Sequence, residues 1–414
     1  MRESIEGVKK KAISKNDSLL KGIRVLDLAD EKASFCSKLL ADMGAYVIKV
    51  EKPGGDASRN IGPFWNNTPH PEKSLFFWYH NTNKRGITLN IEHNSGREIF
   101  CRLLKKTDIV VETFRPGYLK ELGLDFEVLR DINSRLILVS VTGFGQNGPR
   151  KHYQSCDLVA SAMGGQMYVS GSTSTSPLKP YGEQSYYTAS LFAAIGILLA
   201  LQKRRKSGAG EHIDISLQEA VTSTLEHVMI RYFNDHTIPT RQGSLYWNNE
   251  FCIVPCKDGF ILVTLFQQWE TLVEWLDSEG MAGDLMDNKW ADEEYRLKHL
   301  DRIIEVLKRW TLNHTTRELF EMGQLMGFPW APVATPKEVI ESPQLKERGF
   351  FVLIDQPKFQ TCMNYPGLPY QFTSPMVKQW RRAPLIGEDN IRVFQGEIGL
   401  SRKEIKKLTS EGAI

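Results

Sequence analysis

The 414-residue sequence has no strong excess of charge of either sign, because 52 lysines and arginines are balanced by 49 aspartates and glutamates. The resulting net charge of +3 lacks the strong basic bias of proteins that bind the nucleic-acid backbone. We therefore expect no nucleic-acid partner. The composition, with 41% hydrophobic and 24% charged residues, is typical of a folded globular chain.

Cysteines are few and scattered. There are six, and only Cys252 and Cys256 lie close together, without the second pair of ligands that a zinc site requires. We expect six reduced thiols and no metal centre. Because reducing compartments keep thiols unpaired, we also expect a cytoplasmic protein.

Long hydrophobic runs are absent as well. Residues 1–18 are polar and basic, without the apolar core of a signal peptide, and are expected to form a flexible leader. The most apolar stretch, 189–201, is too short to cross a bilayer and is followed by Lys203, Arg204 and Arg205. We interpret it as a buried helix and expect no membrane partner.

Short β-branched segments alternate with amphipathic helical patterns through the first 150 residues. Such alternation predicts a parallel sheet, because parallel neighbours are joined by crossover helices. The fold class that follows is α/β, with a Rossmann-like doubly wound large domain. The expected strands are 22–28, 45–50, 108–112 and 136–141, and the expected helices are 33–43, 95–106 and 125–132.

The loop after the first expected strand, Ala29-Asp-Glu-Lys-Ala-Ser34, contains no glycine. The fingerprint G-x-G-x-x-G, which lets a backbone approach a pyrophosphate, is therefore missing, and no Walker A sequence occurs elsewhere. These absences argue against a nicotinamide dehydrogenase and against a P-loop nucleotidase.

A second, smaller α+β domain is expected over 226–340, after a first part of the large domain over 19–225. It begins with a strand pair around 251–263 that turns at Lys257-Asp258-Gly259, and it continues with helices rich in Trp, Leu and Glu. The sequence changes character again after 333.

Three clusters of basic and aromatic residues follow one another along the expected sheet, where ligands of open α/β sheets bind. Cations there suit phosphate groups, and Phe114 suits stacking on a flat base. A phosphorylated adenosine needs this chemistry, so we predict a nucleotide-bearing ligand, although any single cluster alone is more typical of a solvated loop. The cations are Lys52, Arg59, Lys84, Arg85 and Arg115.

These clusters, in this order, resemble the class III CoA-transferases. The stretches that carry the resemblance include EKPGGDASR, NTNKRGITLN, ETFRPGYLKELGL, SVTGFGQNGP and the closing RRAPLIGEDN. The resemblance implies an acyl-CoA or CoA substrate, no metal, and an interlocked dimer. It also implies that residues 341–414 return to the large domain. Within the family, the combination of ADEK, FFWYHNTNKRG and QSYYTAS is most similar to the aspartate-lacking subunit of succinyl-CoA:benzylsuccinate CoA-transferases.

The resemblance assigns CoA contacts to four residues of suitable chemistry: Lys52, Leu89, Phe114 and Arg115. Glu92 and Glu121 stand where the family places basic residues, and Lys120 beside Glu121 offers a substitute cation. Because two acids that face phosphates repel the ligand, we expect them to weaken CoA binding.

The largest departure from the family is at the nucleophile. The family's aspartate lies nine residues before an Ile-Gly-Ile-Leu run, and that position is Tyr186 here; the companion acid, 29 residues upstream, is Asp157. A carboxylate attacks the thioester to form a mixed anhydride, whereas a phenol of pKa about 10 is protonated at pH 7. Asp157 and Glu183 are alternative nucleophiles, and helix capping is the other role open to Asp157.

Three hypotheses follow. In the first, the chain is the non-catalytic subunit of a heteromeric CoA-transferase that moves CoA between small carboxylic acids, with succinyl-CoA as the candidate donor and benzylsuccinate as the candidate acceptor, and a paralogous partner carries the aspartate. In the second, a homodimer is self-sufficient and uses Asp157 or Glu183. In the third, the chain is a CoA-binding or structural paralogue without turnover. The family's racemase branch is disfavoured, because Cys156 stands where it has a histidine.

Overall fold

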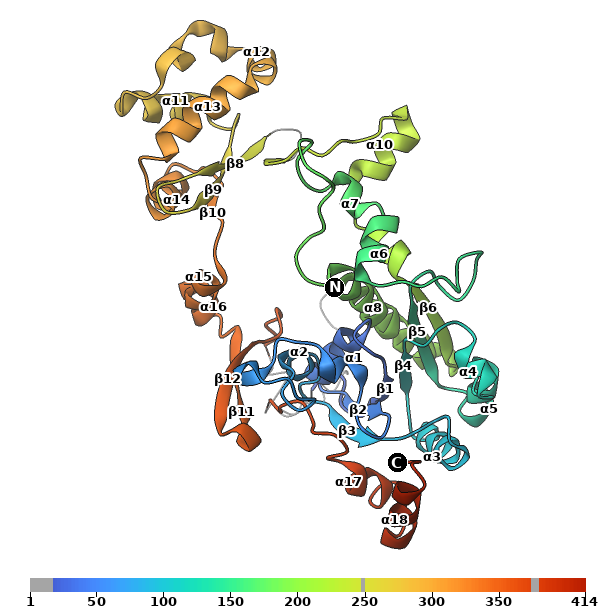
Figure 1. The fold of residues 1–414 in the computed structure, drawn as a ribbon. Helices are drawn as coiled ribbons and strands as arrows, with labels where there is room; N and C mark the ends of the chain where they lie inside the picture. The colour runs from blue at the N-terminus through green and yellow to red at the C-terminus, as the bar shows by residue number, and fades with distance from the viewer. Residues whose placement is uncertain (1–17, 247–249, 374–379) are drawn as a thin grey trace, which may run out of the picture. The chain divides into compact units, whose positions relative to one another are not determined.

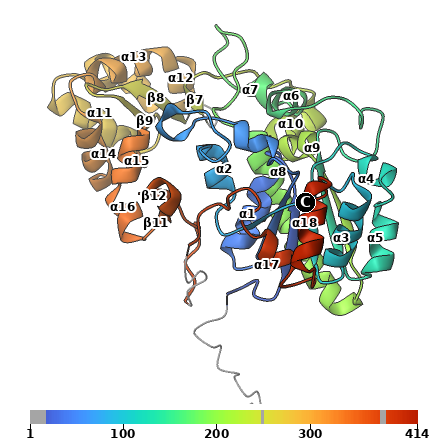
Figure 2. The ribbon, with the colours of Figure 1, turned by 60° about the horizontal axis from the view of Figure 1, so that its bottom comes forward.

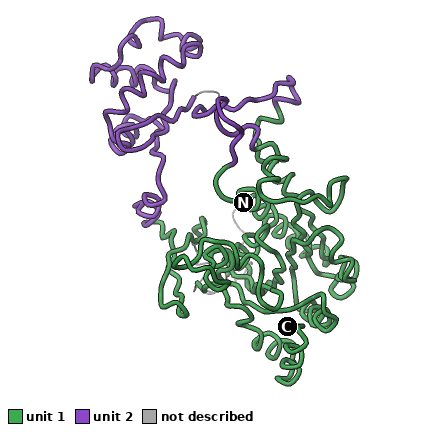
Figure 3. The backbone as a smooth tube through the Cα atoms, viewed as in Figure 1, with its two compact units in different colours: residues 1–166, 180–230, 348–414 green, residues 167–179, 231–347 purple. Residues whose placement is uncertain are grey.

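The computed structural model describes residues 18–246, 250–373 and 380–414, so the expected leader lies outside the described residues except for Ser18. The chain forms two compact units (Figure 3). Unit 1 contains residues 1–166, 180–230 and 348–414, and unit 2 contains residues 167–179 and 231–347. The unit boundaries near 230 and 347 lie a few residues beyond those expected from the sequence. The sequence did not predict that residues 167–179, within the expected large domain, belong to unit 2.

Unit 1 is built on a six-stranded sheet with the order β3-β2-β1-β4-β5-β6 (Figure 1). Every neighbouring pair in it is parallel, so the predicted doubly wound α/β class is confirmed. The strand order reverses between β1 and β4, which is where ligands of such sheets bind. The strands are β1 (Arg24–Leu28), β2 (Tyr46–Glu51), β3 (Arg85–Thr88), β4 (Ile109–Glu112), β5 (Ile137–Thr142) and β6 (Glu211–Ser216).

Helices cover both faces of this sheet (Figure 2). Alternate strand residues point to opposite faces, so Val25 belongs to one core and Leu26 to the other. The first face carries α1 (Ser34–Asp42), α6 (Asp157–Met163), α8 (Gln184–Ser207) and α9 (Leu217–Thr222). The second carries α3 (Asn94–Leu104), α5 (Phe126–Ile132), α17 (Asn390–Phe394) and α18 (Arg402–Ser410). The C-terminal segment therefore returns to unit 1, as expected.

Helix α8 corrects the expectation of a buried helix at 189–201. Only half of its most apolar window is buried, although its length and composition alone would suit a membrane span. Small residues such as Ala189 and Ala193 face the core. Leu191, Ile195 and Leu199 are 44 to 66% exposed. The buried half marks α8 as a core helix of unit 1, and its other face is apolar and open.

Unit 2 has its own core, in which Trp290, Trp310 and Trp330 are buried. Its sheet has the order β10-β9-β8-β7, and β8 and β9 form the antiparallel pair predicted around the turn at 257–259. The strands are β7 (Leu245–Tyr246), β8 (Phe251–Pro255), β9 (Phe260–Thr264) and β10 (Ala331–Pro332). The main helices are α11 (Trp269–Ser278), α12 (Glu293–Lys298), α13 (Leu300–Thr311) and α14 (Thr316–Leu325).

Shorter elements complete the two units. In unit 1 they are α2 (Leu75–His80), α4 (Tyr118–Glu121) and the hairpin of β11 (Phe351–Gln356) and β12 (Thr361–Pro366). Near the boundaries lie α7 (Gln166–Val169), α10 (His227–Asp235), α15 (Pro336–Glu341) and α16 (Pro343–Glu347).

Candidate functional site

A cavity of about 400 Å³ lies at the carboxyl ends of β1, β2 and β4 in unit 1. Leu28, Val50 and Thr113 mark these strand ends in its wall. We call it the main pocket. Three of the residues expected to contact CoA line it together, and they offer a cation, an aliphatic wall and an aromatic ring: Lys52, Leu89 and Phe114. This is the switch point of the sheet, where the fold class places a nucleotide.

The cations around the main pocket are paired with the two acids that depart from the family pattern. Lys52 Nζ donates to Glu92 Oε1 at 2.9 Å, and the Tyr118 hydroxyl donates to the same oxygen at 2.5 Å. Arg115 bonds both carboxylate oxygens of Glu121, in one case at 2.7 Å. The hydrogen bonds from Tyr118 and Lys52 lower the pKa of Glu92, and the bond from Arg115 lowers the pKa of Glu121. Both acids are therefore ionised at neutral pH.

Arg115 and Lys120 line a second cavity of about 210 Å³ beside the main pocket. Buried Glu112 lies in its wall and accepts the backbone N–H of Phe114 at 2.7 Å. Burial raises the pKa of Glu112 to about 7, against the opposing effect of a hydrogen bond with Ser140. Ser140 in turn lies 2.9 Å from His212 Nε2. Glu112, Ser140 and His212 thus form a polar row across β4, β5 and β6 that sequence reasoning missed.

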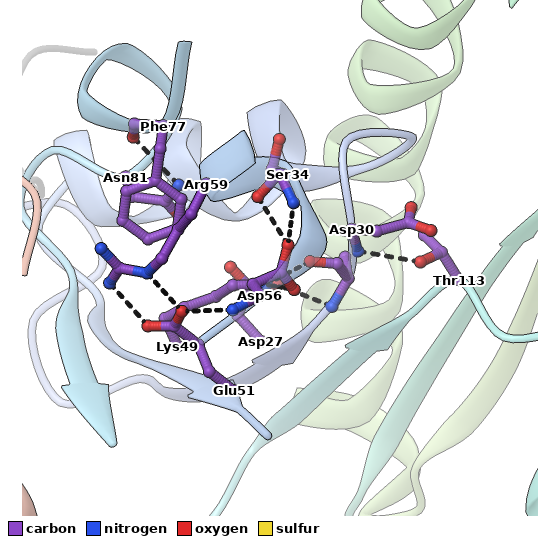
Figure 4. Close-up of polar contacts among 12 residues, drawn as sticks. Asp27, Asp30, Ser34, Lys49, Glu51, Asp56, Arg59, Phe77, Asn81 and Thr113 are labelled. Carbon is purple, nitrogen blue, oxygen red and sulfur yellow. Dashed lines mark hydrogen bonds and ion pairs between the residues drawn. The ribbon is translucent and has the colours of Figure 1, made fainter. Parts of the chain in front are cut away.

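Arg59 and Lys84, expected to bind phosphate, are both buried, and the structure corrects their role. Arg59 binds Glu51 through Nε at 2.6 Å and through Nη2 at 2.8 Å, and it lies over the ring of Phe77 (Figure 4). Lys84 Nζ donates to Asp27 Oδ2 at 2.8 Å. Burial lowers the pKa of Lys84 to about 8. Because their donors are used inside the fold, these cations are not placed to bind a phosphate.

Arg85 is also held within the fold, because its guanidinium lies 3.3 Å from Asp389 in the returning C-terminal segment. Lys84 and Arg85 stand at the amino end of β3. The ligand edge of the sheet is formed by the carboxyl ends of its strands. Neither residue lines the main pocket, so the predicted phosphate contact is corrected here as well.

Tyr186, Asp157 and Glu183 meet at the start of α8. Asp157 Oδ1 accepts the backbone N–H of Ser185 at 2.9 Å and its hydroxyl at 2.6 Å, so this carboxylate caps the helix. The Tyr186 hydroxyl accepts the backbone N–H of Asp157 at 3.0 Å. Glu183 directly precedes the helix, and its carbonyl accepts the N–H of Tyr186 at 3.1 Å.

The phenol of Tyr186 is neutral at physiological pH. Burial and the nearby charge of Glu31 raise the pKa of Tyr186 above its ordinary value of 10. Sequence reasoning missed Glu31. It lies in the loop between β1 and α1, which contacts both the main pocket and helix α8. Asp30 N–H donates to Thr113 in the pocket wall, and Ser190 Oγ of α8 approaches Lys32 O. The altered composition of that loop was the only signal available from the sequence.

Within residues 18–246, 250–373 and 380–414, no group of three or more His, Cys, Asp or Glu side chains is placed to hold a metal ion.

The model of the family described as CoA-transferase family III matches residues 20–390. The chain belongs to this family. The succinyl-CoA:(R)-benzylsuccinate CoA-transferase subunit BbsE of Thauera aromatica is 34% identical over 94% of this chain and 97% of its own length. The succinyl-CoA:mesaconate CoA-transferase of Haloarcula hispanica is 32% identical over 89% of this chain and 94% of its own. Among solved structures, a CAIB/BAIF family protein from Brucella suis is 28% identical, with a TM-score of 0.81 over 92% of this chain and 99% of that one.

Enzymes of this family use CoA thioesters as substrates. The main pocket lies at the strand ends where open α/β sheets bind their ligands. In this chain, the cations Lys52 and Arg115 beside the main pocket are paired with Glu92 and Glu121. The position of the family's nucleophile holds the neutral phenol of Tyr186.

Proposed function

We propose that this chain is the non-catalytic subunit of a heteromeric class III CoA-transferase, and that a paralogous partner chain supplies the nucleophilic aspartate. The observation that carries the proposal is Tyr186, a buried phenol that accepts a backbone hydrogen bond and whose pKa lies above its ordinary value. The transfer needs an anion at this position.

The chemistry explains why a phenol fails. In the first step a carboxylate oxygen attacks the thioester carbonyl and the C–S bond breaks. CoA departs as the thiolate, and a mixed anhydride of the enzyme carboxylate and the donor acid remains. The thiolate then attacks the enzyme's acyl carbon and releases the donor acid, and the acceptor acid reverses both steps. Tyr186 would first have to lose a proton that burial holds in place. It would then form an aryl ester, whose enzyme side has no acyl carbon for the thiolate to attack, so the donor acid could not be released.

Two observations support a partner chain. The open face of α8 carries apolar side chains at helical spacing, including Leu191, Ile195 and Leu199. Exposed apolar faces of this kind are typical of surfaces that associate. The relative from Thauera aromatica is itself described as a subunit. An interlocked dimer with the partner would cover such a face.

We propose succinyl-CoA as the donor and an aromatic succinate such as benzylsuccinate as the acceptor, following the relative's name. We further propose that the complex works in the cytoplasm, where acyl-CoA pools lie and where its six unpaired cysteines would stay reduced.

The test is turnover by separated and combined chains. The purified chain, its aspartate-bearing partner and the co-expressed complex are each given succinyl-CoA and benzylsuccinate, and CoA exchange is followed by chromatography. We expect exchange by the complex and none by this chain alone. Mass spectrometry of the complex with donor thioester should place a covalent CoA adduct on the partner chain. Turnover by this chain alone, abolished in its Asp157→Asn or Glu183→Gln variant, would instead establish a self-sufficient enzyme.

A further inference from the structure

Two carboxylates of unit 1 form ion pairs with the cations beside the main pocket. Glu92, in the loop between β3 and α3, accepts Lys52 Nζ at 2.9 Å and the hydroxyl of Tyr118 at 2.5 Å. Glu121, at the end of α4, binds the guanidinium of Arg115. We call these five residues the carboxylate clasp.

Tyr118 links the two halves of the clasp. Its ring centroid lies 4.7 Å from that of Phe114, and the guanidinium of Arg115 lies 5.7 Å from the same ring. Burial and the bond to Glu92 raise the pKa of Tyr118, so its hydroxyl remains a donor to Glu92. The clasp therefore ties the loop after β2, the loop after β3 and α4 together along one side of the main pocket, where Lys52, Phe114 and Tyr118 are lining residues.

The formal charges of the clasp cancel. Lys52 and Arg115 contribute two positive charges, and Glu92 and Glu121 contribute two negative ones. A phosphorylated nucleotide needs a net positive field and unoccupied donors. All four charged side chains are exposed, and exposed pairs are individually weak. Phosphates can therefore open the clasp, but they must compete with its carboxylates.

We propose that Glu92 and Glu121 are specificity-determining residues that compete with phosphate groups for Lys52 and Arg115 and so weaken the binding of CoA to this chain. The uncharged part of the ligand keeps its contacts with Leu89 and Phe114. The inference rests on the proposed function, in which the partner chain carries the reacting CoA, and it assigns the weak CoA site of the complex to this subunit.

The test is CoA binding measured by titration calorimetry on the complex and on this chain, with pantetheine as a probe that lacks phosphates. We expect Glu92→Gln and Glu121→Gln each to tighten CoA binding to this chain by about five- to tenfold, because each removes one negative charge and releases one cation. Pantetheine binding should not change. The gained affinity should fall as salt rises, whereas binding to the unaltered pocket should respond little.

Glu127→Gln is the matched control, since Glu127 is also exposed and paired, with Arg130 on neighbouring α5. It should leave CoA binding unchanged. The proposal is overturned if Glu92→Gln and Glu121→Gln leave CoA affinity unaltered, if the control tightens it equally, or if pantetheine binding changes in parallel. These readouts are affinities, so they remain decisive even where the turnover of separated chains contradicts the proposed function.

Discussion

The hydroxyl of Tyr186 accepts the backbone N–H of Asp157, and the residue is only 6% exposed. This geometry gives the phenol a structural role at the junction of α6 and α8. The carboxylate of Asp157 is engaged in the same junction through Ser185. The two residues that the family pattern would place at the reacting carbonyl therefore hold two helix ends together in this chain.

Tyr186→Phe tests whether the hydroxyl has any chemical role. The change removes the acceptor of a buried N–H, so we expect the free energy of unfolding to fall by about 1 kcal/mol. Turnover of the complex should stay within about twofold, since the proposed function does not use the phenol. Urea unfolding and steady-state kinetics measure the two effects. A loss of turnover larger than tenfold in a folded complex would assign chemistry to Tyr186.

Glu112→Gln tests the buried acid beneath the Phe114 loop. Its folded pKa of about 7 exceeds the ordinary 4.5, so the folded state holds a proton that the unfolded state releases between these pH values. Its contribution to stability is therefore lost as pH rises from 4.5 to 7. At pH 8 we expect the Gln variant to be more stable than the unaltered chain by up to about 3 kcal/mol, with little difference near pH 4.5.

Urea unfolding at both pH values measures this difference, and Glu127→Gln is the exposed control. Equal stability of the Glu112→Gln variant and the unaltered chain at pH 8 would contradict the expected cost of the buried charge.

At the residue scale, the sequence predicted which side chains line the main pocket where they follow the carboxyl end of a strand, and their contact with CoA stays a prediction. Lys52 and Phe114 follow such strand ends, and both line the main pocket. Sequence reasoning failed for Lys84, which stands at the amino end of β3, and for Arg59, which binds Glu51 and the carbonyl of Pro384. The contact with Pro384 joins residues 325 positions apart, and no local sequence pattern predicts it.

At the scale of elements, four of the six parallel strands (β1, β2, β4 and β5) and helices α1, α3 and α5 could be predicted, because β-branched runs alternate there with helical periodicity. Strands β3 and β6 were missed. Helix α8 could not be predicted in full. Both of its faces are apolar, so the sequence carries no contrast that separates the buried face from the open one. Small residues against the sheet and large ones outside are a pattern that only packing reveals.

Leu199→Glu tests the open face of α8. Leu199 is 66% exposed, so the variant should fold normally as a single chain. Burying the new carboxylate against an apolar partner surface would be costly, and we expect the dissociation constant of the complex to rise at least about 100-fold. Size-exclusion chromatography with light scattering measures the association. Leu325→Glu, at the end of α14 and 82% exposed, is the control that should leave association intact. Unchanged association of the α8 variant would exclude this face as the interface.

At the scale of the whole molecule, the division into two units could be predicted from the change of pattern near 226 and 340. The assignment of residues 167–179 to unit 2 could not be predicted, because that segment is short and rich in serine and threonine and has no hydrophobic pattern of its own. The return of the C-terminal segment to unit 1 came from family resemblance. Its physical basis, seen only in the structure, is the packing of α17 and α18 on the second sheet face.

Association should also govern thermal stability. If a partner covers the open face of α8, the folded complex is stabilised by mass action, and its melting temperature must depend on protein concentration. A tenfold rise in concentration adds about 1.4 kcal/mol for a two-chain complex, which corresponds to about 1 °C when divided by the unfolding entropy of two chains of this length. Differential scanning calorimetry over a hundredfold range of concentration should therefore show a steady rise for the complex, provided that unfolding is reversible. The Leu199→Glu chain should melt at a constant temperature, because it has no partner to lose. A melting temperature of the complex that is independent of concentration would show that the two chains do not stabilise each other.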